Sequence, residues 1–227
     1  MRIAVLGTGI VGRTLAEGLA VQGHEVVMGT RDVSETLART EPDAMGNPPF
    51  SQWQTEHSDI PLITFAEAAA QAEVVINATA GVASLAALEA AGSGLEDKVL
   101  IDVANPLDFS KGFPPTLSVA NTDSLAEQIQ RAFPSSKVVK SLSHMNARLM
   151  IDPGRLPEGH EVFLAGNDDS AKETLRGLLK EFGWQEEHII DLGGIEAARG
   201  IEMMLPLWLS LLAKLSSADF SLKLVTS

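Results

Sequence analysis

Short runs of β-branched and aliphatic residues alternate with helix-like stretches along most of the chain. Several runs are apolar at every position, which is typical of strands covered by helices on both faces. This alternation predicts βαβ units and a mainly parallel sheet. The strands expected in the first part of the chain are Arg2–Gly7, Glu25–Thr30, Leu62–Thr64, Val74–Thr79, Val99–Ala104 and Lys137–Leu142.

Between these runs, the spacing of apolar residues predicts helices. The helices expected there are Val11–Gln22, Phe65–Gln71, Ser84–Ala91 and Asp123–Phe133. The segment Thr40–Asp59 contains three prolines and is predicted to be an irregular surface loop.

After Leu142 the pattern changes, and two further strands, Glu161–Ala165 and His188–Leu192, flank a helix expected at Asp169–Phe182. The last element, Ile195–Ser216, is apolar nearly all round and is therefore expected to be buried. It lies either in the core of the molecule or in a subunit interface, and Pro206 is expected to kink it.

A glycine-rich turn follows the first strand and opens the first helix. It reads Gly7-Thr8-Gly9-Ile10-Val11-Gly12. In a dinucleotide-binding βαβ unit, the first glycine makes the tight turn, the second lets the backbone approach pyrophosphate and the third permits close helix–strand packing. The context of strand, turn and helix supports a dinucleotide site rather than a simple turn.

The end of the second strand selects the dinucleotide. An NAD site places a carboxylate there, whereas this chain has Thr30 followed by Arg31, which suit the 2′-phosphate of NADP. Asp32 is interpreted as the cap of a helix that starts near Val33. The alternative for Arg31 is a surface ion pair with Asp32 or Glu35.

Further cofactor contacts are expected at the carboxyl ends of the next strands. These candidates are Asn77, Ala78, Thr79, Ala80, Asn105 and Ser143. Together the patterns predict an α/β, Rossmann-type fold with a doubly wound, mainly parallel sheet and a small C-terminal α+β extension that ends in the long apolar helix. Residues 1–142 would form the NADP-binding domain, and residues 143–227 a small C-terminal domain with the acceptor cleft and a dimer interface.

Composition narrows the function. The net charge of −13 argues against nucleic acid and anionic membranes as partners, and 45% apolar residues are ordinary for a globular protein. The chain has no cysteine, which excludes disulfides and thiolate metal sites, and no metal site is expected. The longest apolar stretch is about half of the roughly 20 residues that span a membrane. The expected protein is cytoplasmic.

The sequence resembles the coenzyme F420 (deazaflavin)-dependent NADP oxidoreductases and their bacterial homologues over essentially its whole length. The resemblance rests on the glycine-rich turn and on Gly29-Thr30-Arg31, Lys137-Val138-Val139, and the ending from Asp191-Leu192-Gly193 to Phe220-Ser221-Leu222-Lys223. It implies an NADP-binding Rossmann domain, a small C-terminal domain and often a homodimer. It also implies hydride exchange between nicotinamide and a flavin-like acceptor in the cleft between the domains.

One segment departs from that family. Where the deazaflavin enzymes have a histidine after the sixth strand, this chain has Ser143, and His144 comes one residue later. Because the departure lies beside the expected acceptor, a deazaflavin, an ordinary flavin and another small oxidant all stay open. His144 is the candidate proton donor, and Lys140 and Asn146 are secondary candidates.

On the last helix, Arg199 and Glu202 are spaced to pair with each other, or they line the cleft. Met203, Met204 and Trp208 are expected in the helix core rather than as a wall for the acceptor ring. Two alternative functions remain for the whole chain. It could be an NADP-dependent reductase of a small metabolite, or a module that senses NADPH without turnover.

Overall fold

The computed structural model describes residues 1–43 and 46–226, and its centre is one eight-stranded sheet. The strand order is β10-β9-β8-β5-β4-β1-β2-β3, parallel from β3 to β8. The strands are β1 (Arg2–Leu6), β2 (Glu25–Thr30), β3 (Leu62–Thr64), β4 (Val74–Asn77), β5 (Val99–Asp102), β8 (Lys137–Ser141), β9 (Val162–Gly166) and β10 (Ile189–Asp191). A small hairpin, β6 (Leu107–Asp108) and β7 (Thr116–Leu117), stands apart from the sheet.

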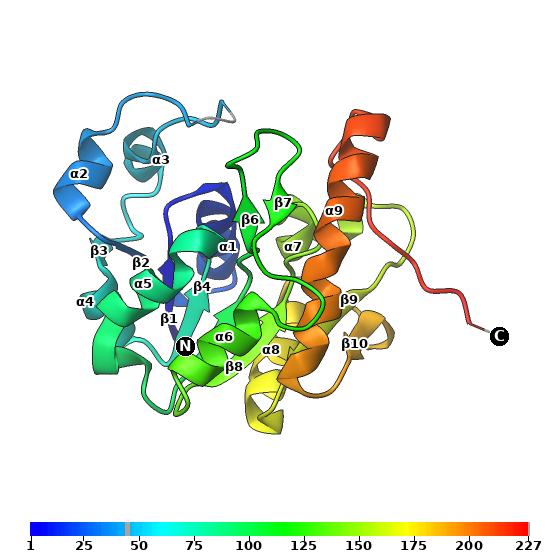
Figure 1. The fold of residues 1–227 in the computed structure, drawn as a ribbon. Coiled ribbons are helices and arrows are strands. Elements are labelled where there is room, and N and C mark those ends of the chain that lie inside the picture. Colours follow the sequence, from blue (N-terminus) through cyan, green and yellow to red (C-terminus); the bar gives the residue numbers. More distant parts are fainter. Residues whose placement is uncertain (44–45, 227) are drawn as a thin grey trace.

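Helices cover both faces of the sheet (Figure 1). Those on one face are α1 (Ile10–Val21), α3 (Phe50–Glu56), α7 (Ala147–Ile151) and α8 (Asp169–Glu181). Those on the other face are α4 (Phe65–Gln71), α5 (Gly81–Ala91), α6 (Leu125–Ala132) and the start of α9 (Ala198–Leu215). The short helix α2 (Val33–Ala38) follows β2. The predicted Rossmann-type α/β fold with a mainly parallel sheet is confirmed.

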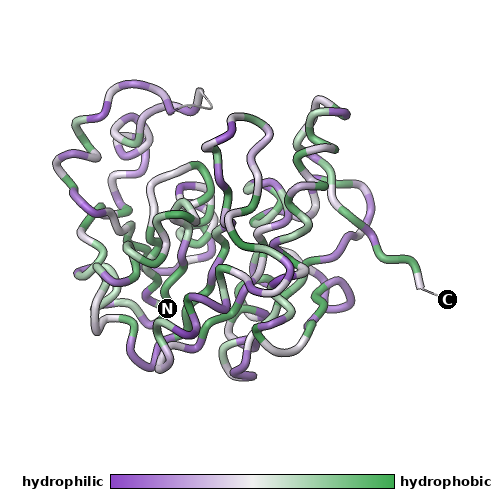
Figure 2. The backbone as a smooth tube through the Cα atoms, in the orientation of Figure 1, coloured by the Kyte–Doolittle hydropathy of each residue, from purple (hydrophilic) through white to green (hydrophobic). Residues whose placement is uncertain are grey.

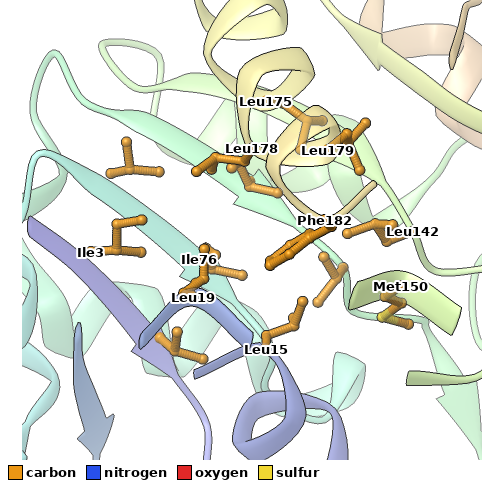
Figure 3. Close-up of a cluster of buried hydrophobic side chains, with 14 of the residues drawn as sticks. Ile3, Leu15, Leu19, Ile76, Leu142, Met150, Leu175, Leu178, Leu179 and Phe182 are labelled. Atoms are coloured by element: carbon orange, nitrogen blue, oxygen red, sulfur yellow. The ribbon is translucent and has the colours of Figure 1, made fainter. Parts of the chain in front are cut away.

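The two apolar layers follow the alternation of side chains along the strands. Ile3 and Val5 of β1 face α1 and α8, whereas Ala4 and Leu6 face α4 and α5. Figure 3 shows the first layer, in which Phe182 packs among side chains from the sheet, α1 and α8. Hydrophobic residues are concentrated in the central strands, as Figure 2 shows. Both faces of the strands are covered, which explains why they are apolar at nearly every position.

The C-terminal part of the chain continues this sheet. Strand β9 pairs antiparallel with β8, and β10 pairs parallel with β9. The sheet is therefore continuous across residue 142, where the domain boundary was placed. The division into residues 1–142 and 143–227 stays a prediction.

The prediction that Thr40–Asp59 is irregular throughout is wrong, because α3 forms there; residues 44–45 of this segment lie outside the described residues. Pro49 stands at the N-cap of α3, so the prolines precede the helix and do not interrupt it. Phe50 is buried, and Trp53 packs against the same apolar layer one turn later. The three prolines indicated a loop, so the short amphipathic spacing of this helix was not recognised in the sequence.

The last helix is less buried than its apolar sequence predicts. Ile201, Leu205 and Leu209 are buried, but Met203, Leu207 and Leu215 are 40–54% exposed. In the isolated chain only one face of α9 covers the sheet, so the whole helix is not buried in the core of the molecule. Burial of its other face in a subunit interface stays a prediction. No helix of the described residues is long and apolar enough to span a bilayer.

The packing predicts the effect of truncating α1. Leu19 is fully buried in the layer of Figure 3, so Leu19→Ala should lower the free energy of unfolding by about 2–5 kcal/mol. Val21 lies on the same helix and is 78% exposed, so Val21→Ala should change it by less than about 1 kcal/mol. Urea denaturation followed by circular dichroism measures both, and equal losses would contradict the assigned orientation of α1.

Candidate functional site

Four loops meet at the edge of the sheet formed by the carboxyl ends of its parallel strands. A Cβ added to Gly7, after β1, would lie 2.5 Å from the carbonyl oxygen of Ala78, after β4. A Cβ on Gly81 would lie 1.9 Å from the carbonyl oxygen of Asn105, after β5. Asn105 in turn donates from Nδ2 to the carbonyl of Ser143, after β8, over 2.7 Å. Residues predicted from four separate strands are thus neighbours.

The glycine-rich turn has the expected geometry. Gly7 adopts a φ of +116°, which favours glycine, and its N–H donates to Gly29 O over 3.0 Å. A Cβ on Gly12 would lie 2.2 Å from the carbonyl of Gly7, so α1 can pack this closely on the turn only with glycine there. A Cβ on Gly9 would meet no atom within 4 Å, which leaves the space that a dinucleotide backbone requires.

The start of α1 fits a phosphate group. Gly9 is its N-cap, no side chain caps it, and its first turn carries no acidic residue. Its first N–H groups and the positive end of the helix dipole are therefore available to an anion. Ile10 is exposed at this end, whereas Val11 packs against the apolar core.

Arg13 supports the turn and was missed by the sequence analysis. It is buried, donating from Nε to the carbonyl of Thr8 over 2.8 Å and from Nη1 to that of Pro48 over 2.7 Å. Its guanidinium lies 5.7 Å from the ring centre of Phe50. Burial lowers the pKa of Arg13. The only signal in the sequence was a charged residue on the apolar face of α1.

A cavity of about 370 Å³ lies between the glycine-rich turn and the end of β2. Arg31 is exposed there and, among the described residues, makes no ion pair or hydrogen bond. Asp32 caps α2 by accepting from Glu35 N over 2.8 Å, as predicted, and Glu35 pairs with Arg39. The alternative ion pair of Arg31 with these carboxylates is therefore not formed. Arg39, which the sequence analysis missed, is a second cation of this cavity.

Thr30 lies at the expected strand end, but its side chain is buried. The hydroxyl of Thr36 donates to Asp32 O over 2.7 Å, so the 2.8 Å contact between the two threonine hydroxyls requires Thr30 to donate. Thr30 thus holds α2 in place, and the cationic groups that line the cavity are the guanidinium groups of Arg31 and Arg39. A direct role of Thr30 in phosphate binding stays a prediction.

Asn77 is fully buried beneath the cavity floor. It donates from Nδ2 to Asp102 Oδ1 over 2.7 Å and accepts from the hydroxyl of Thr79 over 2.7 Å. Its side chain therefore shapes the loop that contains Ala78, Thr79 and Ala80. Thr79, Ala78 and Ala80 themselves line the cavity.

Three charged side chains are buried next to Asn77. Lys140 is fully buried and lies 2.8 Å from Asp102 and 3.2 Å from Glu202, and it also donates to the carbonyl of Ala104. Burial alone would lower the pKa of Lys140, but the two carboxylates raise it above its ordinary value. Burial raises the pKa of Glu202, although Lys140 opposes this shift. Lys140 is an ammonium group that holds strand ends together.

The predicted pairing of Arg199 with Glu202 is wrong, because the two residues face different partners. Arg199 pairs with Glu127 of α6. Glu202 points inward, where it accepts from the backbone N–H groups of Leu125 and Ala126 over 2.9 and 3.1 Å. The N-terminus of α6 and Lys140 together compensate this buried carboxylate, and neither was visible in the local spacing on the helix.

His144 is 4% exposed, and its ring packs against that of Phe163. Its Nε2 lies 3.5 Å from Glu161 O, and burial lowers its pKa to about 4. The imidazole is therefore neutral at neutral pH and carries no proton beyond its single N–H. Its role as a proton donor stays a prediction.

The remaining predicted residues lie at the periphery of this edge. Asn146 caps α7 by accepting from Arg148 N. On α9, Met203 is exposed and Met204 packs on the small cluster around Phe163, whereas Trp208 stacks on Phe220 of the C-terminal tail. Met203 is therefore not in the helix core, contrary to expectation, and Trp208 is only partly buried.

The chain is similar in sequence and fold to known proteins. Residues 2–106 match the family model described as NADP oxidoreductase coenzyme F420-dependent. The F420-dependent NADP reductase of Methanothermobacter marburgensis is 30% identical over 93% of this chain and 92% of its own length. A solved structure described as a candidate F420-dependent NADP reductase, from Arthrobacter sp. FB24, is 57% identical with a TM-score of 0.93 and covers 99% of both chains.

A more distant structure shares the fold alone. The imine reductase of Streptomyces aurantiacus is 17% identical with a TM-score of 0.61, covering 95% of this chain and 64% of its own. The match to the Methanothermobacter enzyme covers nearly the full length of both proteins and therefore shows the family. The chain belongs to the family of F420-dependent NADP reductases, which are NADP-dependent oxidoreductases.

Proposed function

We propose that this protein exchanges a hydride between NADP(H) and a deazaflavin of the F420 type. The observation that carries the proposal is the cavity at the end of β2, where Arg31 and Arg39 lie beside the glycine-rich turn. A guanidinium group presents a planar fork of donors that matches a phosphate ester. In a chain of net charge −13, these local cations are the means of holding a 2′-phosphate.

The residues at the sheet edge support this reaction by binding and orientation. NADP supplies a hydride donor or acceptor in its nicotinamide ring. The N–H groups at the start of α1 would hold the pyrophosphate, and the loops after β4, β5 and β8 would fix the ring position. Direct hydride transfer requires close and correct placement more than acid–base catalysis, so the neutral His144 is compatible with it.

The acceptor follows from the family. Relatives across nearly the whole chain are named F420-dependent, which favours a deazaflavin over an ordinary flavin. Ser143 stands where the family is expected to have a histidine, so this position does not decide the acceptor.

Turnover tests the acceptor directly. Purified protein should oxidise NADPH in the presence of F420, with a loss of absorbance at the nicotinamide band, and FMN should support a lower kcat/KM. If FMN or a small metabolite is reduced and F420 is not, the acceptor assignment is wrong. Tight NADPH binding with no acceptor reduced would instead favour a sensing module.

Substitution of Arg31 tests whether the protein binds the 2′-phosphate of NADP. Arg31→Ala should weaken NADPH binding about 10- to 100-fold, because hydrogen bonds to a charged group contribute about 1.5–3 kcal/mol. NADH lacks the 2′-phosphate, so its affinity should change less than about threefold. Arg39→Ala should show the same selectivity. Titration of protein fluorescence measures both affinities, and equal weakening of NADPH and NADH would refute the phosphate assignment.

We further propose that α9 forms an interface between two copies of the chain. Its outward face exposes Met203, Leu207 and Leu215, and the C-terminal tail beside it exposes Leu224 and Val225 at 51 and 89%. Such apolar exposure on adjacent segments is typical of an interaction surface. A homodimer would bury this surface and account for the apolar sequence of the helix.

Leu207 tests the interface. Leu207→Glu places a charge on the 52% exposed position and should convert a dimer to a monomer, which size-exclusion chromatography with light scattering detects. Val82→Glu is the matched control, because Val82 is 70% exposed on α5, away from this face. A wild-type monomer at micromolar concentration would contradict the proposal.

A further inference from the structure

We propose that Asn105 and Ser143 together form the subsite for the carboxamide group of the nicotinamide ring. This inference rests on the NADP-dependent function proposed above and deepens it. One side chain would bind the NH₂ of the carboxamide and the other its carbonyl oxygen. The two residues would therefore determine specificity for that group.

Two polar atoms at the sheet edge lack partners within the described part of the chain. Ser143 is 2% exposed, and its hydroxyl makes no hydrogen bond. The Oδ1 atom of Asn105 is buried and also unpartnered, although Nδ2 of the same amide donates to the carbonyl of Ser143 over 2.7 Å. Buried polar groups are nearly always hydrogen-bonded, so these two atoms from neighbouring residues each lack a hydrogen bond that a bound group or a water molecule would supply.

Their chemistry is complementary to a primary carboxamide. Because Nδ2 of Asn105 is already bonded to Ser143 O, the Oδ1 atom is available as an acceptor. The hydroxyl of Ser143 is available as a donor. A carboxamide presents an NH₂ donor and a carbonyl acceptor on one planar group, so Asn105 would accept from its NH₂ and Ser143 would donate to its carbonyl.

The position along the sheet agrees with this role. The strand order places β2, with Arg31, on one side of β1 and places β4, β5 and β8 on the other. A dinucleotide whose pyrophosphate lies at the glycine-rich turn after β1 directs its two nucleosides to opposite sides. With the 2′-phosphate side at β2, the nicotinamide side falls at the ends of β4, β5 and β8, where Asn105 and Ser143 lie.

The buried charges hold this subsite rigid. Lys140 donates to the carbonyl of Ala104, and Asp102 Oδ1 accepts from Ala104 N over 3.3 Å, so the residue before Asn105 is fixed on both sides. After it, Leu107 N donates to Asn105 O over 2.8 Å. Lys140 is thus a positioning residue for Asn105. Its buried ammonium group holds this loop in one conformation before the dinucleotide binds.

Comparison of two dinucleotides tests the proposal. The 3-acetylpyridine analogue of NADP⁺ replaces the NH₂ with a methyl group of similar size and keeps the carbonyl. The wild-type protein should bind NADP⁺ about 5- to 30-fold more tightly than this analogue, because the analogue leaves Asn105 Oδ1 unpaired. Isothermal titration calorimetry measures both affinities without any acceptor, so the readout is independent of turnover.

Two variants separate the roles. Ser143→Ala should weaken both dinucleotides by about 5- to 30-fold, since both keep the carbonyl, whereas Asn105→Ala should weaken NADP⁺ and bring its affinity close to that of the analogue. Ser141→Ala is the matched control, because Ser141 is also buried but its hydroxyl already donates to Phe163 O over 2.7 Å. It should leave the ratio of the two affinities unchanged. Thermal unfolding verifies that each variant is folded.

Equal affinity of the wild-type protein for the two dinucleotides would overturn the assignment of Asn105, whether or not its variant folds. An unchanged NADP⁺ affinity in folded Ser143→Ala would overturn the assignment of Ser143 and indicate that a water molecule satisfies its hydroxyl. If the wild-type protein bound neither dinucleotide, the proposed function would fail together with this subsite. NADP⁺ binding without discrimination would leave the function intact and refute only the subsite.

Discussion

The buried ion pairs of Lys140 are the interaction on which the rest of this molecule depends. A fully buried ammonium group is tolerated only with compensating partners, and removing one partner of such a pair costs about 3–5 kcal/mol. Its two carboxylates, Asp102 and Glu202, come from β5 and α9, and Glu202 also binds the N-terminus of α6. One charge therefore joins the ends of the central strands to the long C-terminal helix.

The distribution of charge also matters at the outer surface of the site. The chain is strongly acidic, and a uniform field of that sign repels phosphate groups. The structure places two guanidinium groups and the uncapped start of α1 around one cavity, while nearby carboxylates are engaged with backbone or with Arg39. Local cations would therefore favour a phosphate group despite the net charge, because contacts over a few ångströms lie well within the screening length of about 10 Å.

Sequence patterns predicted what depends on short-range chemistry. Strand β2, α4, the glycine-rich turn and the cap at Asp32 lie where expected, because each is determined by neighbours within a few positions. The partners of Glu202 and Arg13 were not predictable, since they come from residues 62 and 35 positions away or from backbone groups of another segment. Helix α3 was missed because its prolines lie at its boundary. The exposed face of α9 was missed because the spacing of apolar residues does not show which other segments cover them.

The reversal of direction at β9 has a consequence for the loops at the site. Because β9 runs antiparallel to β8, its amino end and not its carboxyl end reaches the edge where the loops gather, so the last strand to contribute a carboxyl-end loop is β8. The segments that lead into β9 and β10 therefore also end at this edge. The edge is thus built from two kinds of backbone: loops that leave the carboxyl ends of parallel strands, and segments that enter the amino ends of the last two strands.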